Sequence, residues 1–175
     1  SEIDRVIEKS DKTNEEIKRD VDRAVRRSEE TLKRIRETVE EIVKTVEKLI
    51  RDLRRRVEDK GQDKEIEEIV KKIKKDIDDA KEELRKLAEE DKERVKAVKK
   101  KVEDLVREDK EEIDRRLTDK DKAKELRDRL ERSLREIAKK IKKVLDDTDR
   151  VLRDIERTIE ELKKRLREVL ERVRK

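Results

Sequence analysis

Apolar residues recur every three or four positions along almost the whole chain, and most of the positions between them are charged. Steps of three and four keep one face of an α-helix apolar, whereas a strand would alternate with a period of two. Three such apolar stripes follow one another, and the phase of the pattern changes between them. The pattern therefore predicts three long helices, over about residues 2–59, 64–117 and 120–174.

The two predicted turns differ in their signals. Gly61 is the only glycine, and glycine is the residue that most readily takes the left-handed conformation which ends a helix. Asp63 follows it and is a suitable N-cap for the second helix. Thr118 and Asp121 have the spacing of a capping box before the third helix.

The second turn contains neither glycine nor proline, so the evidence for it is the phase of the apolar stripe. Carried forward from Ile113, the second stripe predicts apolar residues at the positions of Lys120 and Lys124. The stripe instead restarts at Ala123, about 100° around a helix, and a continuous helix would split its apolar face. We therefore place a turn at 118–120. The alternative is an unbroken helix in a domain-swapped dimer.

A finer repeat of 18 residues underlies the stripes. Eighteen residues make five turns at 3.6 residues per turn, whereas a heptad repeat would force a left-handed supercoil. The repeat therefore predicts nearly untwisted helices. Its members in the first helix include Ile3, Val21, Val39 and Val57, and in the third helix Leu126, Val144 and Leu162.

Short connections between helices of equal length favour antiparallel neighbours. The predicted fold is therefore an all-α, antiparallel, up-down-up three-helix bundle, with about 55 residues per helix and residues 1–175 in a single domain. Each helix carries one apolar stripe, which is enough for one three-helix seam and leaves no second apolar face. We expect a monomer, with a domain-swapped dimer or a higher oligomer as the alternative.

Polar residues interrupt the stripes at a few positions, and their heights along the bundle can be compared. Residues of the first two helices lie level when their numbers add to about 122, and residues of the last two when they add to about 238. This predicts two buried polar layers. One layer contains Asp91 with Thr31, Thr148 and, as a further member, Ser28; the other contains Asp109 with Asn14, Ser133 and, as further members, Thr13 or Ser10.

Each layer has matching chemistry, because a carboxylate only accepts hydrogen bonds while hydroxyl and amide groups can donate them. An unpaired buried polar group costs about 1–3 kcal/mol, so Asp91 and Asp109 need those donors. Such layers would fix the register of the helices. The alternative is that both aspartates lie in water at the edge of the stripe, as most acidic residues do.

Composition excludes most enzyme chemistry. The 175 residues include 57 Lys or Arg and 52 Asp or Glu, and no His, Cys, Met, Pro or aromatic residue. Zinc sites of His and Cys, disulfides, thiol nucleophiles, imidazole bases and glycine-rich phosphate loops are therefore not possible. We predict no catalytic residue, no metal and no cofactor. No apolar run approaches the roughly 18 residues of a membrane span, so we expect a soluble chain.

The charges suggest partners only weakly. Basic runs at 54–56 and 99–101 are flanked by acidic residues, and no aromatic side chain is present to stack on bases. The apolar face of each helix is narrow and aliphatic, unlike that of a membrane-surface helix. We therefore predict no nucleic-acid partner, no membrane partner and no required protein partner. The sequence leaves localisation open.

Taken together, the 18-residue repeat, the Ile/Leu/Val seam, the equal helices and the Glu/Lys/Arg surface resemble a computationally designed, parametric three-helix bundle. This resemblance implies a protein without an evolved biochemical function, made as a scaffold for helix packing and stability. The layers at Asp91 and Asp109 are similar to the hydrogen-bond networks of designed bundles. The alternative is an assembly or binding module, a helical spacer or oligomer component that docks partner helices.

Overall fold

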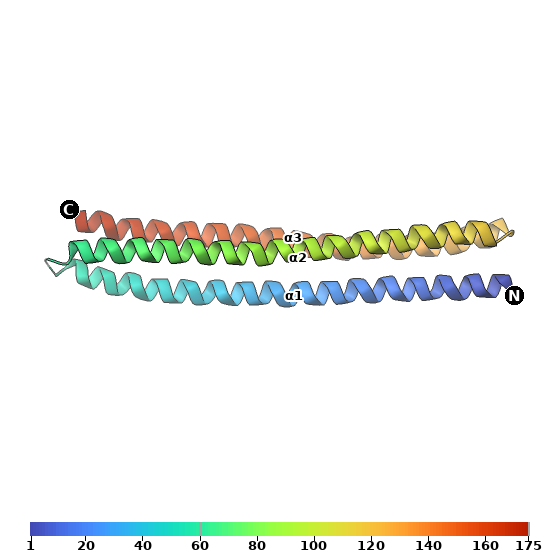
Figure 1. The fold of residues 1–175 in the computed structure, drawn as a ribbon, viewed down its shortest axis with the longest axis horizontal. Coiled ribbons are helices and arrows are strands. Elements are labelled where there is room, and N and C mark those ends of the chain that lie inside the picture. Colours follow the sequence, from blue (N-terminus) through green and yellow to red (C-terminus); the bar gives the residue numbers. More distant parts are fainter. Residues whose placement is uncertain (60, 175) are drawn as a thin grey trace. The chain divides into compact units, whose positions relative to one another are not determined.

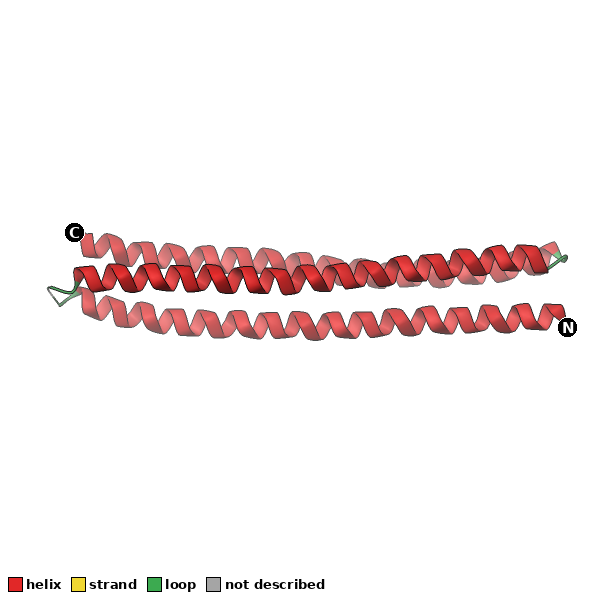
Figure 2. Ribbon diagram, viewed as in Figure 1, coloured by secondary structure: helices red, strands yellow, loops and turns green. Residues whose placement is uncertain are grey.

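The computed structural model describes residues 1–59 and 61–174, and within them it contains helices and no strand (Figure 2). Three helices follow in chain order: α1 (Glu2–Val57), α2 (Asp63–Arg116) and α3 (Lys120–Arg174) (Figure 1). Each of them carries the apolar stripe from which it was predicted. The all-α fold with three long helices is confirmed.

The helix α1 ends at Val57, two residues earlier than predicted. Its last turn tightens, because the backbone N–H of Asp59 donates to the carbonyl oxygen of Arg56 (3.0 Å), three residues back instead of four. Gly61 has a φ of 102°, a value that other residues rarely adopt. Glycine therefore serves the turn after the helix instead of the position directly behind its last residue.

The cap predicted for α2 was wrong by one residue. Asp63 is the first helical residue, and the carbonyl oxygen of Gln62 accepts the first backbone hydrogen bond, from Ile66 (3.0 Å). Gln62 therefore occupies the N-cap position. The carboxylate of Asp63 lies in the first turn, where the positive end of the helix dipole favours it.

The start of α3 is also shifted by one residue. The Oδ1 atom of Asp119 accepts hydrogen bonds from the backbone N–H groups of Asp121 (3.1 Å) and Lys122 (3.2 Å). Asp119, and not Thr118, is therefore the N-cap, because its side chain reaches the free amides of the first turn. The turn occupies 117–119, one residue before the predicted position.

The chain divides into two compact units, each with one segment of every helix. Unit 1 comprises Ser1–Glu30 and Glu90–Asp147, and unit 2 comprises Thr31–Glu89 and Thr148–Lys175. In Figure 1 the α1 segment of unit 1 is blue and that of unit 2 is cyan to green. Each unit is a three-helix bundle with its own core. The expectation of a single domain with nearly untwisted helices stays a prediction.

Ion pairs between helices reveal their directions in unit 1. The residue numbers add to 121 in two α1–α2 pairs and to 241 in two α2–α3 pairs, as antiparallel helices require. They differ by 118 in two α1–α3 pairs, as parallel helices require. The pairs are Lys9–Glu112, Asp20–Lys101, Lys110–Glu131, Asp114–Arg127, Asp11–Arg129 and Asp22–Lys140.

Unit 2 repeats the same register. The residue numbers of its α2–α3 pair Asp78–Lys163 add to 241, and those of its α1–α3 pair Glu47–Arg165 differ by 118. Charged side chains of the two units thus recur at positions 36 residues apart, which is two periods of the 18-residue repeat. The up-down-up topology predicted from the short turns is confirmed.

Both cores consist of aliphatic side chains only, apart from the polar residues described below. Ile17, Leu130 and Ile141 are almost fully buried in unit 1, as are Ile50 and Leu166 in unit 2. Burial of one such side chain contributes about 1.5–3 kcal/mol. These cores provide the main stabilisation of the two bundles.

Three stripe residues were predicted to lie in the core but are exposed: Ile3 (43 %), Leu49 (37 %) and Leu87 (47 %). A seam between three helices covers a strip narrower than the stripe in the sequence, so residues at the edge of that stripe reach the surface.

Candidate functional site: buried polar side chains

Polar side chains enter the aliphatic core mainly in unit 1. Among the described residues of unit 2, Thr148 is buried and Thr31 is half-buried. The buried polar residues of unit 1 are Ser10, Thr13, Asn14, Ser28, Asp91, Asp109 and Ser133.

Asp91 is only 1 % exposed, and both of its carboxylate oxygens have a partner. Its Oδ2 atom accepts a hydrogen bond of 2.6 Å from the hydroxyl group of Ser28, which is itself fully buried. Its Oδ1 atom lies 3.4 Å from Nη2 of Arg94, one turn along α2. A hydrogen bond to a charged group contributes about 1.5–3 kcal/mol, so this short contact offsets much of the cost of burying the carboxylate.

The other two residues predicted for the Asp91 layer, Thr31 and Thr148, belong to unit 2. The side chain of Thr148 is fully buried and that of Thr31 is half-buried. Their membership of the layer stays a prediction. The partner that the structure gives to Asp91 is Ser28, which the sequence had suggested only as a further member.

Asp109 is 3 % exposed, and burial raises the pKa of its carboxyl group, while the charge of Lys9 and a hydrogen bond from Thr13 oppose this shift. The Thr13 hydroxyl has one hydrogen but two acceptors in reach, because it also lies 3.0 Å from the carbonyl oxygen of Lys9. The Oδ2 atom of Asp109 has no hydrogen-bond partner among the described residues. Asp109 is thus less well satisfied than Asp91.

The remaining residues of the Asp109 layer are buried in the same unit. The Nδ2 atom of Asn14 donates to the backbone carbonyl oxygen of Ser10 (3.2 Å), one turn back on α1. The Asn14 Oδ1 atom and the Ser10 hydroxyl are buried without a hydrogen-bond partner in residues 1–59 and 61–174. Ser133 is 9 % exposed. The structure thus brings Thr13 to Asp109, and the participation of the other three stays a prediction.

The 18-residue repeat contains the signal that identifies the donor of Asp91. On α1 it relates the two serines to each other, and on α2 it relates the two aspartates. Continued into unit 2, it reaches two buried aliphatic residues. The three copies of this position pair are Ser10 with Asp109, Ser28 with Asp91, and Val46 with Ile73.

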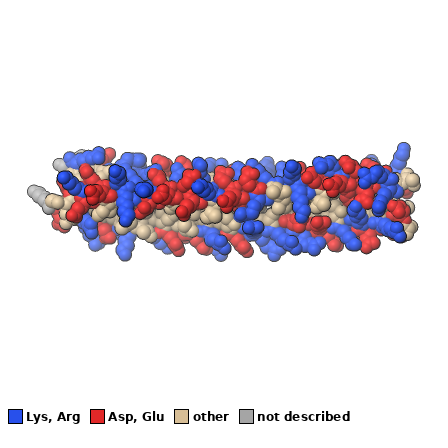
Figure 3. Space-filling view, in the orientation of Figure 1, with Lys and Arg blue, Asp and Glu red and all other residues tan. Residues whose placement is uncertain are grey.

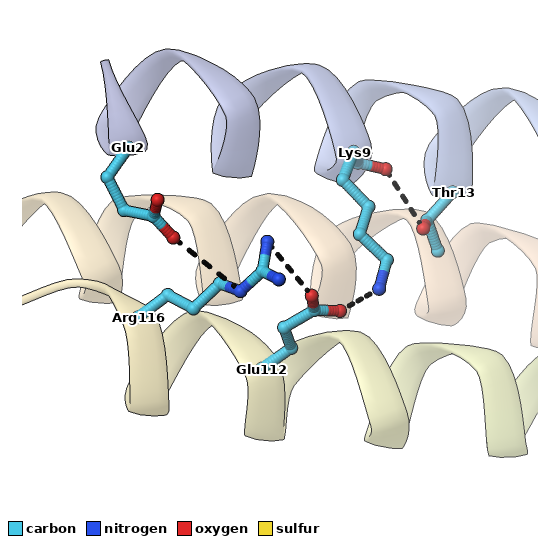
Figure 4. Close-up of polar contacts among 5 residues, drawn as sticks. All are labelled: Glu2, Lys9, Thr13, Glu112 and Arg116. Atoms are coloured by element: carbon cyan, nitrogen blue, oxygen red, sulfur yellow. Dashed lines mark hydrogen bonds and ion pairs between the residues drawn. The ribbon is translucent and has the colours of Figure 1, made fainter.

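A row of charged side chains covers α1 and α2 beside Asp109 (Figure 4). Lys9 pairs with Glu112, whose other oxygen lies 3.3 Å from Nη1 of Arg116. The Nε atom of Arg116 lies 3.6 Å from Glu2. Lys9 therefore divides its charge between Glu112 and the buried carboxylate of Asp109.

A second electrostatic difference lies on the surface between α2 and α3. In unit 1, Lys110 binds Glu131, and this hydrogen bond lowers the pKa of Glu131. In unit 2 the equivalent positions, 36 residues away, hold Lys74 and Arg167. Partial burial and then repulsion from nearby cations, Arg167 first, lower the pKa of Lys74. The repeat thus replaces an ion pair with two like charges.

Within the part of the chain that the structure describes, no group of three or more acidic side chains is arranged to hold a metal ion. No helix there is long and apolar enough to cross a membrane. The chemistry available in the buried layers is therefore hydrogen bonding and the uptake of a proton by a carboxylate.

Comparison with known proteins gives one likeness in fold. The chain is similar to a solved structure entitled "Computationally designed three helix bundle", with 19 % identity, a TM-score of 0.41, and coverage of 98 % of this chain and 81 % of the other. No protein family matches the chain, and no curated protein does. The fold assignment given above rests on the helices and ion pairs of this chain alone.

Proposed function

We propose that this chain is a designed structural scaffold without a catalytic task, in which buried polar pairs specify how the helices of unit 1 meet. The observation that carries this proposal is the 2.6 Å hydrogen bond from Ser28 to the buried carboxylate of Asp91. A shift of one helix by a turn would remove this donor and leave a buried charge unpaired. Such a loss costs about 3–5 kcal/mol.

Three further features support the proposal. The cores contain only Ala, Val, Ile and Leu around the polar residues, and the same interhelical register recurs in both units. A uniform aliphatic seam allows several registers of similar energy, so a polar pair adds a distinction that apolar packing lacks. The repeat of 18 residues is typical of a helix built to a regular geometry.

The test is to convert the polar pair into its aliphatic copy with Ser28→Val/Asp91→Ile, the residues found at Val46 and Ile73. We expect the variant to stay helical but to lose its single arrangement, with more than one set of amide resonances or a mass above 21.3 kDa by sedimentation. The matched control, Val46→Ile/Ile73→Val, should keep one set of resonances. A single set and an unchanged mass in the Ser28→Val/Asp91→Ile variant would contradict the proposal.

A second candidate function, a module that docks a partner helix, is favoured by one observation. Unit 2 has an apolar groove between α1 and α2 in which Leu49 is 37 % exposed. Large exposed apolar surfaces often mark binding sites.

A further inference from the structure

The groove of unit 2 lies between α1 and α2 and has a volume of about 320 Å³. Its floor is formed by the buried side chains of Val46, Ile73 and Ile77, and its sides include Ile42 and Leu49. The residues that contribute from α1 extend from 38 to 49, which is about three turns of helix. The groove is therefore long, narrow and apolar along its bottom.

Two carboxylates line this groove, and no Lys or Arg side chain does so among the described residues. Glu41 projects from α1 and Asp76 from α2, and both are exposed. Neither forms an ion pair with another residue that the structure describes. In a chain with 57 basic residues, this groove is thus a local site of uncompensated negative charge.

The apolar strip continues along α2 beyond the groove. Leu87, 47 % exposed, follows the lining residue Ala80 by seven positions, and Glu83 follows Asp76 by the same interval. Residues seven apart lie on the same face of a helix. Figure 3 shows uncharged side chains exposed between rows of charged ones over the α1–α2 seam of unit 2. An apolar strip with acidic edges therefore runs along this seam.

Unit 1 contains the repeat-equivalent groove with the opposite charge. Its volume is about 240 Å³, and Arg23 and Arg94 line it at the positions that correspond to Glu41 and Asp76. Ala24 replaces the larger Ile42. The chain thus offers two grooves of the same origin, and only the groove of unit 2 combines large apolar side chains with negative charge.

We propose that the α1–α2 groove of unit 2 binds a basic amphipathic helix, which goes beyond the role of a scaffold. Such a helix would place its apolar residues over Val46, Ile73 and Leu49, as helices do in hydrophobic grooves, and complete a local four-helix arrangement. Lys or Arg residues beside that apolar stripe would face Glu41 and Asp76. Charge complementarity of this kind selects the partner and its orientation.

The experiment uses two helical peptides of about 18 residues, five turns each, with the same Leu stripe and flanked either by Lys or by Glu. Fluorescence anisotropy at low salt with the full chain should show that the Lys peptide binds at least about tenfold more tightly. The double variant Glu41→Lys/Asp76→Lys should reverse this preference. Both positions are exposed, so the variant should keep its helical content by circular dichroism.

The matched control is Arg23→Glu, the equivalent change in the groove of unit 1, which should leave the preference for the Lys peptide unchanged. Equal binding of the two peptides would overturn the proposal, as would a preference for the Lys peptide that survives Glu41→Lys/Asp76→Lys. Sedimentation of the chain alone supplies a third outcome. A dimer that dissociates on Leu49→Glu would assign the groove to a second copy of this chain and overturn the proposal as well.

Discussion

The buried pair Ser28–Asp91 of unit 1 and the buried pair Val46–Ile73 of unit 2 occupy the same position of the repeat, and one is polar while the other is aliphatic. In unit 2 the pair stabilises the core by removing apolar surface from water. In unit 1 the carboxylate is tolerated because a fully buried hydroxyl donates to it at 2.6 Å. The comparison teaches that this bundle position accepts a buried charge only together with its donor.

The Asp109 copy shows what happens when the surroundings of the carboxylate change. Three residues after Asp91 stands Arg94, whose guanidinium group faces the carboxylate. Three residues after Asp109 stands Glu112, an acid that is engaged with Lys9 and Arg116. Asp109 therefore lacks a cation of its own helix, and burial prevails in raising its pKa.

The largest effect is expected when a charge enters the aliphatic copy without a donor. Ile73→Asp should lower the free energy of unfolding by about 3–5 kcal/mol, because nothing at Val46 can donate to the new carboxylate. Adding Val46→Ser should restore about 1–3 kcal/mol by recreating the pair of unit 1. Urea unfolding followed by circular dichroism measures both values.

Val46→Ser alone is the control for this transplant, and it should be destabilising. If the serine fails to recover any stability in the Ile73→Asp background, the donor does not account for the tolerance of Asp91.

The next largest effect separates the two serines of unit 1. Ser28→Ala should cost about 1–3 kcal/mol, because it removes the donor of the buried Asp91 carboxylate. Ser10→Ala should change the stability by less than about 0.5 kcal/mol, because the Ser10 hydroxyl has no hydrogen-bond partner among the described residues. Equal losses in the two variants, measured by the same urea titration, would show that the two copies are equivalent.

A pH titration sharpens the contrast further. The pKa of Asp109 is raised in the folded state, whereas in the unfolded chain an aspartate has a pKa of about 3.9. Between these two pKa values the folded state holds more protons, so this carboxyl group lowers the stability as the pH rises from about 4 through its folded pKa. Above that pKa its unfavourable contribution is complete.

The chain should therefore lose stability relative to Asp109→Asn as the pH rises through this window, and the difference should then become constant. Urea unfolding of both proteins at a series of pH values measures it. Parallel pH curves for the two proteins would contradict the raised pKa.

The smallest effect concerns the charge difference on the surface. Arg167→Glu should pair with Lys74, as Glu131 pairs with Lys110, and stabilise the chain by about 0.5 kcal/mol. The gain should shrink in high salt, because exposed ion pairs are screened. Thermal unfolding at two salt concentrations tests this, and a stabilisation that does not depend on salt would point to packing instead of charge.

Much of the fold could be predicted because it depends on local periodicity. The apolar stripe located all three helices, and the phase shift before Ala123 located a turn that has no glycine or proline. Which residue caps a helix was less accessible. Both Thr118 and Asp119 can cap, and the choice depends on which side chain the turn directs toward the amides of Asp121 and Lys122.

The polar positions were likewise visible in the sequence, but their partners were not. Counting levels along the bundle associated Asp91 with threonines first, although the 18-residue repeat also relates Ser28 to Ser10 and Asp91 to Asp109. Level is a coordinate along the helix axis only. Which hydroxyl reaches a carboxylate also depends on the angle around that axis and on the side-chain rotamer.

The sequence by itself determined where the helices lie, which face of each is apolar and that the core is aliphatic, because these properties follow from the spacing of residues along one chain. Only the tertiary structure decided that Ser28 satisfies Asp91, that Asp109 keeps an unpartnered oxygen, and that Leu49 and Leu87 remain exposed. Hydrogen bonds and burial depend on distances of a few ångströms between different helices. Those distances are set by the packing of all three helices together.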